Sequence, residues 1–306
     1  MNIQWYPGHM HKAQKEIKKI ISKVDLIIEV LDARIPFSSE NPMIADLRGD
    51  KPCIKILNKS DLADKEMTEV WQNYLEKESG VKTFTFTTEH ADKASLLPNL
   101  CHKLIPNKKS TVKGLHAMIM GIPNVGKSTL INILAGRIIA KTGNEPAVTK
   151  NQQRINIDNN ITLIDTPGVL WPNIENKSSG YRLGITGAIK DTAMQYTDIA
   201  FYAAEFMLEH YPSLLKSRFE IETLPETEIE LLELIGSKRG CLGSGGRVNL
   251  DKISKIFINE LRTGQIGCIT LETPEMRDKE LFELNELRKA KEEKKLTRKR
   301  NWKNNK

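Results

Sequence analysis

The stretch Gly121-Ile122-Pro123-Asn124-Val125-Gly126-Lys127-Ser128-Thr129 satisfies the pattern G-x-x-x-x-G-K-[ST]. This pattern is typical of a phosphate-binding loop, because its glycines let backbone N–H groups turn inward around phosphate oxygens. We expect the part from Asn124 to Thr129 to contact the phosphates, with Lys127 neutralising the β and γ oxygens and Ser128 ligating Mg²⁺. The apolar run Leu115–Met120 predicts a preceding strand, and Lys127–Leu134 predicts a following helix. Both flanks disfavour a chance Gly/Lys turn, so the stretch predicts a nucleoside triphosphate site.

A second motif indicates which base is bound. Asn58-Lys59-Ser60-Asp61 has the form N-K-x-D and follows the short predicted strand Cys53–Leu57. The Asp61 carboxylate can accept hydrogen bonds from both N1–H and the N2 amino group of guanine, whereas adenine offers no such pair of donors. Asn58 can hold the loop and N7, and the stem of Lys59 can lie over the base. Thr87 and Thr88, at the end of the predicted strand Val81–Phe86, are candidates for backbone contacts to the base.

A third motif predicts the metal site. Asp165-Thr166-Pro167-Gly168 follows the predicted strand Ile161–Ile164 and has the form D-x-x-G. Asp165 can hold the Mg²⁺ shell, and the Gly168 N–H can meet the γ-phosphate. Thr149 falls between this motif and the phosphate loop, so its hydroxyl is the candidate for a second Mg²⁺ ligand. The alternatives are an ordinary turn for the motif and an ordinary loop threonine for Thr149.

The order of the motifs predicts the fold. An ordinary small GTPase has the phosphate loop first and N-K-x-D late, whereas here N-K-S-D and Thr87-Thr88 precede the phosphate loop. The same sheet can form if the polar connector Pro106–Gly114 joins the N- and C-termini of the ordinary order. The new termini then lie between D-x-x-G and N-K-x-D. The permuted order also places the helical region directly after Gly168, so the γ-phosphate state can act on that region.

The predicted elements divide the chain into three parts. Strands alternate with helices as far as about Trp171, and helical patterns dominate beyond it. We therefore predict an α/β fold: a circularly permuted P-loop G domain with a mostly parallel sheet, followed by an all-α C-terminal domain. The expected parts are a GTPase domain at 1–183, a helical C-terminal domain at 184–285 and a basic tail at 286–306.

Charge is concentrated in the tail. The chain has a formal net charge of +7, and the segment Glu286–Lys306 alone contains ten Lys/Arg and three Asp/Glu, so the remaining body is neutral. A basic block on a neutral body favours a polyanionic partner, nucleic acid before anionic membrane, although a solvated helix end is the simpler alternative. The four scattered cysteines and a start without an apolar signal segment lead us to expect a cytoplasmic protein without membrane contact.

Further motifs carry a family resemblance. Trp5-Tyr6-Pro7-Gly8-His9-Met10 and Asp32-Ala33-Arg34-Ile35-Pro36, with the phosphate loop, D-T-P-G and the permuted order, resemble the ribosome biogenesis GTPase A family. These are bacterial circularly permuted GTPases that act in large-subunit assembly. The resemblance extends from Met1 to about Thr273 and implies a C-terminal domain that contacts ribosomal RNA. Ala147 departs from it, because the family often has Gly there.

The resemblance also addresses catalysis. Many GTPases position the attacking water with a Gln after D-x-x-G, but Val169 and Leu170 stand here, and apolar side chains cannot orient water. The resemblance implies that His9 takes this role; by itself His9 would be a loop or RNA-contacting histidine. Asn124 resembles the phosphate-loop Asn of GTPases that use K⁺ as a second cation, with a loop-capping Asn as the alternative.

Two function classes follow. The first is a monomeric GTP-hydrolysing switch, with GTP/GDP and Mg²⁺ as cofactors, that binds the RNA and proteins of the immature large ribosomal subunit. Its intrinsic hydrolysis is expected to be slow until the subunit binds. The second is a GTP-gated adaptor for a protein partner or an anionic membrane surface. An ATPase is disfavoured by Asp61.

Overall fold

The computed structural model describes residues 15–106, 114–140, 153–158, 160–168, 170–171, 174–190 and 194–304. Three residues discussed above, His9, Thr149 and Val169, lie outside these ranges. So do Ala147 and the Trp5–Met10 motif.

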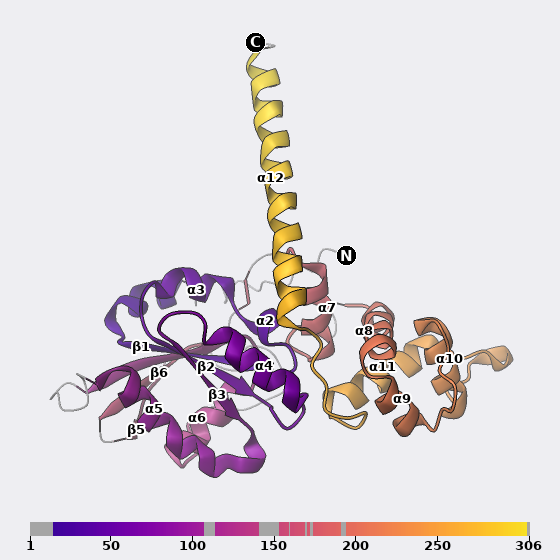
Figure 1. The fold of residues 1–306 in the computed structure, drawn as a ribbon, viewed down its shortest axis with the longest axis horizontal. Helices are drawn as coiled ribbons and strands as arrows, with labels where there is room; N and C mark the ends of the chain where they lie inside the picture. The colour runs from indigo at the N-terminus through magenta and orange to yellow at the C-terminus, as the bar shows by residue number, and fades with distance from the viewer. Residues whose placement is uncertain are drawn as a thin grey trace.

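One six-stranded sheet forms the nucleotide-binding part (Figure 1). Its strands are β1 (Leu26–Asp32), β2 (Cys53–Asn58), β3 (Val81–Phe86), β4 (Leu115–Gly121), β5 (Gln153–Asp158) and β6 (Ile161–Asp165). The spatial order is β3-β2-β1-β4-β6-β5; all neighbours are parallel except β5, which runs antiparallel to β6. The central strands β1, β2 and β4 are apolar and covered on both faces, as parallel strands require. The prediction of an α/β fold with a mostly parallel sheet is confirmed.

The strand order brings the motifs together. The chain moves outward from β1 through β2 to β3 and then returns to place β4 on the other side of β1. In an open parallel sheet, ligands bind at the carboxyl ends of the strands where the order reverses in this way. The loops after β1, β2, β4 and β6 all leave from this edge. N-K-S-D, the phosphate loop and D-T-P-G therefore meet there although they are far apart in the sequence.

Helices cover the sheet. They are α4 (Lys65–Leu75), η2 (Thr88–Leu96), α5 (Leu97–Leu104) and α6 (Lys127–Ala135). Asp64 caps α4 by accepting the Met67 N–H at 3.0 Å. Trp71 of α4 is fully buried, which confirms the expectation that this face packs in the core.

The second half is helical, as expected. Its helices are α7 (Lys177–Ile185), α8 (Tyr196–His210), α9 (Pro212–Phe219), α10 (Glu228–Lys238) and α11 (Leu250–Arg262), with the short turn η5 (Ser244–Gly246). The apolar faces of α8, α10 and α11 meet in a core built around Ala203, Leu231 and Phe257. The proposed boundary between residues 183 and 184 falls inside α7, which lies between the sheet and these helices (Figure 1).

After α11 the chain returns to the nucleotide-binding part. The backbone N–H of Ile269 donates to the Leu62 carbonyl at 3.1 Å, and that of Leu271 donates to the Arg34 carbonyl at 2.8 Å. The indole N–H of Trp71 donates to the Glu272 carbonyl at 3.0 Å. The final helix α12 (Pro274–Asn304) begins at this contact and projects away from the body (Figure 1).

Two short helices follow β1: α2 (Pro36–Ser39) and α3 (Pro42–Arg48). Each helix has proline in its first turn, where the missing N–H has no intrahelical partner to lose, and Asn41 caps α3. Pro98 likewise lies in the first turn of α5. At the N-terminal side, residues 15–20 are helical and continue into the 3₁₀ turn η1 (Ile21–Lys23).

No helix among the described residues is long and apolar enough to cross a membrane.

Candidate guanine-nucleotide site

The phosphate loop joins β4 to α6 and has the backbone that this motif requires. Asn124 and Gly126 both have positive φ, 62° and 88°, which turns successive N–H groups toward one side of the loop. A side chain at Gly121 would approach the Val30 carbonyl oxygen to 2.7 Å, and one at Gly126 would collide with the amide nitrogen of Asn58. Both glycines are therefore needed for the loop to lie against its neighbours.

Lys127 and Asp165 form a buried ion pair in the centre of the site. The ammonium of Lys127 at the start of α6 contacts the carboxylate of Asp165 at the end of β6, and both side chains are almost fully buried. Burial lowers the pKa of Lys127 and raises the pKa of Asp165, while their mutual attraction opposes both shifts. The pair holds two of the residues expected to meet phosphate and Mg²⁺ within contact of each other.

The donor set fits a magnesium ion. Within the described residues, Asp165 Oδ2 is buried and has no hydrogen-bond partner. The half-buried Ser128 is the second residue of α6, next to Lys127. A carboxylate and a hydroxyl are ligands that Mg²⁺ prefers. Asp165 and Ser128 are therefore suited to this ion; Thr149 lies outside the described residues.

The N-K-S-D loop is bonded directly to the phosphate loop. The Asn58 side-chain amide donates to the Val125 carbonyl at 2.5 Å, and the Lys59 ammonium donates to the Asn124 carbonyl at 2.7 Å. Lys59 itself has a positive φ of 58°, which turns the chain sharply at the end of β2. The two motifs thus form one rigid unit, in which the half-buried Asp61 follows at the edge of the sheet.

The Thr87-Thr88 segment is tied to the same unit. Ser60 donates to the Phe86 carbonyl through its backbone N–H at 3.2 Å and its hydroxyl at 3.1 Å. The Thr87 hydroxyl accepts the Glu89 N–H at 3.2 Å and caps η2, while Thr88 is exposed. The Thr87 side chain is therefore occupied by this cap.

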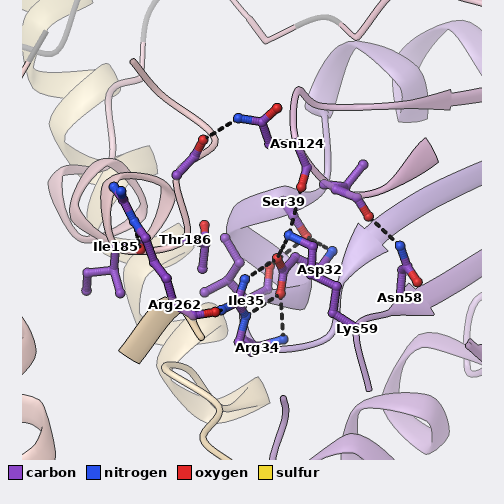
Figure 2. Close-up of polar contacts among 12 residues, drawn as sticks. Asp32, Arg34, Ile35, Ser39, Asn58, Lys59, Asn124, Ile185, Thr186 and Arg262 are labelled. Carbon is purple, nitrogen blue, oxygen red and sulfur yellow. Dashed lines mark hydrogen bonds and ion pairs between the residues drawn. The ribbon is translucent and has the colours of Figure 1, made fainter. Parts of the chain in front are cut away.

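Asp32 and Arg34 hold Lys59 in the N-K-S-D loop, Asn58–Asp61, which we call the base loop. No sequence motif predicted residues for this role. Arg34 donates to both carboxylate oxygens of Asp32, at 2.9 and 2.8 Å, and Lys59 donates to the same carboxylate at 2.9 Å (Figure 2). Burial alone would raise the pKa of Asp32, but the two cations hold it well below its usual range. The signal in the sequence was an Asp and an Arg two residues apart, directly after a buried strand.

This network continues into the helical part. Arg34 Nη1 donates to the Arg262 carbonyl at the end of α11, at 3.0 Å. The Arg262 side chain in turn donates to the carbonyls of Ile185 and Gly184 at the end of α7, both at 2.8 Å (Figure 2). The base loop is thus connected to two helices that follow the D-T-P-G motif in the sequence.

A second connection leaves from the phosphate loop. The Asn124 side-chain amide donates to the Gly187 carbonyl at 2.7 Å, just beyond α7 (Figure 2). Gly168 also lies close to the loop, because a side chain there would come within 3.2 Å of the Pro123 backbone. Gly168, the residue expected to meet the γ-phosphate, and Gly187, two residues after α7, therefore both lie against the phosphate loop.

Comparison with known proteins agrees with this site. A family model described as 50S ribosome-binding GTPase matches residues 116–231. A relative from Priestia megaterium named ribosome biogenesis GTPase A is 44% identical, over 90% of this chain and 98% of its own. The chain is also similar to the solved GNP-bound YlqF from T. maritima, with a TM-score of 0.61 and 28% identity, covering 87% of this chain and 99% of that one.

A GDP-bound structure of TM YlqF gives a TM-score of 0.58 at 28% identity and covers 85% of this chain and 99% of that one. These two structures are bound to GNP and to GDP, guanine nucleotides, which agrees with a phosphate loop bonded to an N-K-x-D loop. The motifs, the sheet order and these similarities together show that this GTP-hydrolysing chain belongs to the ribosome biogenesis GTPase A family.

Proposed function

We propose that the protein binds the immature large ribosomal subunit in its GTP state and leaves after hydrolysis. The names of its relatives and of the matching family model support a ribosomal partner. The observation that carries the switch is the pair of contacts from the phosphate loop, Gly168 against Pro123 and Asn124 to Gly187. A change at the γ-phosphate would pass through them to α7 and to the helices beyond it.

Each motif has a role in this proposal. Asp61 selects guanine through paired hydrogen bonds, and the backbone N–H groups from Asn124 to Thr129 hold the phosphates. Lys127 exchanges its contact with Asp165 for phosphate oxygens when nucleotide binds. Asp165, Ser128 and Thr149 would hold Mg²⁺, which neutralises charge on the β and γ oxygens.

The attacking water needs a polar residue, and Val169 and Leu170 cannot supply one. The Leu170 side chain is fully buried in the core. We assign the positioning of this water to His9, whose imidazole can orient or accept a proton from water near neutral pH. We further assign Asn124 as a ligand of K⁺.

We assign nucleotide hydrolysis and RNA binding to different parts of the chain. Residues 1–183 would bind and hydrolyse GTP, and residues 184–285 would contact ribosomal RNA. The basic segment Lys12–Lys23 would add phosphate contacts. We further propose that the protein acts in the cytoplasm and as a monomer.

The test is GTP turnover with and without purified large subunits. Wild type is expected to turn over slowly alone and at least tenfold faster with subunits, whereas His9→Ala should bind GTP normally and lose the stimulation. His90→Ala, at an exposed position in η2, is the matched control and should behave as wild type. Full stimulation of His9→Ala would remove His9 from the mechanism, and no stimulation of wild type would refute a subunit-activated GTPase.

A further inference from the structure

The final helix has two halves of opposite charge. Residues 274–287 contain five Asp/Glu and two Lys/Arg, whereas residues 288–306 contain two Asp/Glu and ten Lys/Arg. The first half touches the body of the protein and the second half projects beyond it (Figure 1). The excess positive charge of the chain is therefore carried on an arm held away from the neutral body.

The base of the arm is firmly attached. Arg277 lies over the rings of Phe37 and Tyr74, 5.5 and 5.3 Å from their centroids, and the Tyr74 hydroxyl donates to Asp278 at 2.5 Å. These contacts join the start of α12 to α2 and α4. Met276 packs against the hydrophobic core at the same level.

The next two turns are bonded to α7 and to the residues just before it. Arg182 donates to both oxygens of Glu280, at 3.0 and 2.7 Å, and Asn176 donates to Glu280 at 2.6 Å. About two turns further along α12, Arg288 donates to Glu175 at 2.6 Å. Asp278 and Glu280 of the acidic first half are thus bonded to the body of the protein, and the arm begins at Arg288.

The arm presents one continuous basic face. At 3.6 residues per turn, Arg288, Lys291, Lys294, Lys295 and Arg298 fall within about 140° of the helix circumference. Glu292 and Glu293 fall outside this sector. The five cations span about 15 Å along the axis. Lys291, Lys294, Lys295 and Arg298 are exposed, and none of these four forms an ion pair with any residue that the structure describes.

The composition of the other faces decides which polyanion fits. A helix that lies in a lipid surface needs a broad apolar face opposite its basic one. Between Arg288 and Arg298 the remaining circumference carries Lys289, Ala290, Glu292, Glu293 and Thr297, with Leu296 as the one large apolar residue, and it is exposed. Such a helix gains little from lipid, but its row of cations suits the regularly spaced phosphates of a nucleic-acid backbone.

We propose that residues 288–298 of α12 form an RNA-binding arm that grips the phosphate backbone of a ribosomal RNA duplex. The identification of the RNA as ribosomal rests on the proposed function; the binding of duplex RNA does not. Because α7 and the residues before it hold the base of the arm, the same segment that follows the γ-phosphate motif sets its direction.

The test measures binding of the full-length protein to a fluorescent RNA duplex of mixed sequence over a series of KCl concentrations. The arm variant replaces Lys291, Lys294, Lys295 and Arg298 with Gln, a good helix former that removes only charge. The control variant removes the same charge from exposed lysines elsewhere, by Lys65→Gln, Lys103→Gln, Lys216→Gln and Lys279→Gln.

The arm variant is expected to bind the duplex at least tenfold more weakly. The slope of log affinity against log salt should fall by about three units, because each lost phosphate contact contributes about 0.7–0.9. The control variant should keep the wild-type slope. A version with Arg at Lys291, Lys294 and Lys295 should also keep it, since charge and not lysine itself is required.

Two results would overturn the proposal. One is an equal slope for the arm variant and wild type at unchanged circular dichroism and GTP turnover. The other is a specific loss of flotation with phosphatidylcholine–phosphatidylserine vesicles while duplex binding persists, which would assign the arm to lipid. Neither readout uses ribosomal subunits, so both remain interpretable if the proposed subunit binding fails.

Discussion

At the scale of single residues, Asp61 is the residue that we propose selects the base. Asp61→Asn is expected to lower GDP affinity by about two orders of magnitude, because it replaces two charge-assisted hydrogen bonds to guanine with weaker ones. The preference for guanosine over adenosine diphosphate should fall with it. The measurement is competition binding of the two diphosphates to the purified protein.

Asp64→Asn is the matched control for this variant. Asp64 lies three residues away and caps α4, a position where Asn serves as well as Asp. It should therefore leave both the affinity and the base preference unchanged. Unaltered selectivity in Asp61→Asn would show that another group reads the base.

At the scale of elements, most of the nucleotide-binding part could be predicted from the sequence. The strands β2, β3, β4 and β6 lie next to glycine, aspartate or asparagine, and their predicted bounds differ from the observed ones by at most one residue. The helices α2 and α3 were missed because they are only four and seven residues long, too short for an amphipathic pattern. Elements shorter than two turns are fixed by their capping residues and neighbours instead.

Long-range contacts could not be predicted. The motifs predict both residues of the Lys127–Asp165 pair as site residues. No motif predicts that Asp32 and Arg34 hold Lys59 in place. Nor did any pattern indicate that the segment after α11 would return to Trp71 and Arg34. These pairs join residues up to 237 positions apart, Leu271 and Arg34, and only the packed fold brings them together.

The link between α11 and α7 gives a prediction at this scale. Arg262→Gln is expected to lower the free energy of unfolding by about 2 kcal/mol, since it leaves the Gly184 and Ile185 carbonyls without their charged donor. It should also speed GDP dissociation severalfold, because the end of α7 contacts Asn124 in the phosphate loop. Urea unfolding and stopped-flow release of a fluorescent GDP measure the two effects.

Arg218→Gln is the comparison for Arg262→Gln. Arg218 is partly exposed, pairs with the buried Glu260 and touches neither α7 nor the phosphate loop in the described contacts. It should cost about 1 kcal/mol, because Arg239 still pairs with Glu260, and it should leave GDP release unchanged. Equal effects of the two substitutions on GDP release would show that α7 does not influence the nucleotide site.

At the scale of the whole molecule, the permuted order gives a physical route for the proposed connection between nucleotide binding and partner binding. The phosphate loop touches Gly168 and the residue after α7, while the base loop reaches Arg262 through Asp32 and Arg34. The helices of the second half are thus bonded to both sides of the nucleotide site. α7 also holds the base of α12, so one segment connects the γ-phosphate motif to both surfaces proposed to meet RNA.

The most direct test of this account is sedimentation of the protein with purified large ribosomal subunits in the presence of a non-hydrolysable GTP analogue or of GDP. A partner that the γ-phosphate controls can gain affinity only through contacts that differ between the two states. We predict at least tenfold tighter binding with the analogue, and release when it is exchanged for GDP. Equal binding with both nucleotides would contradict the switch.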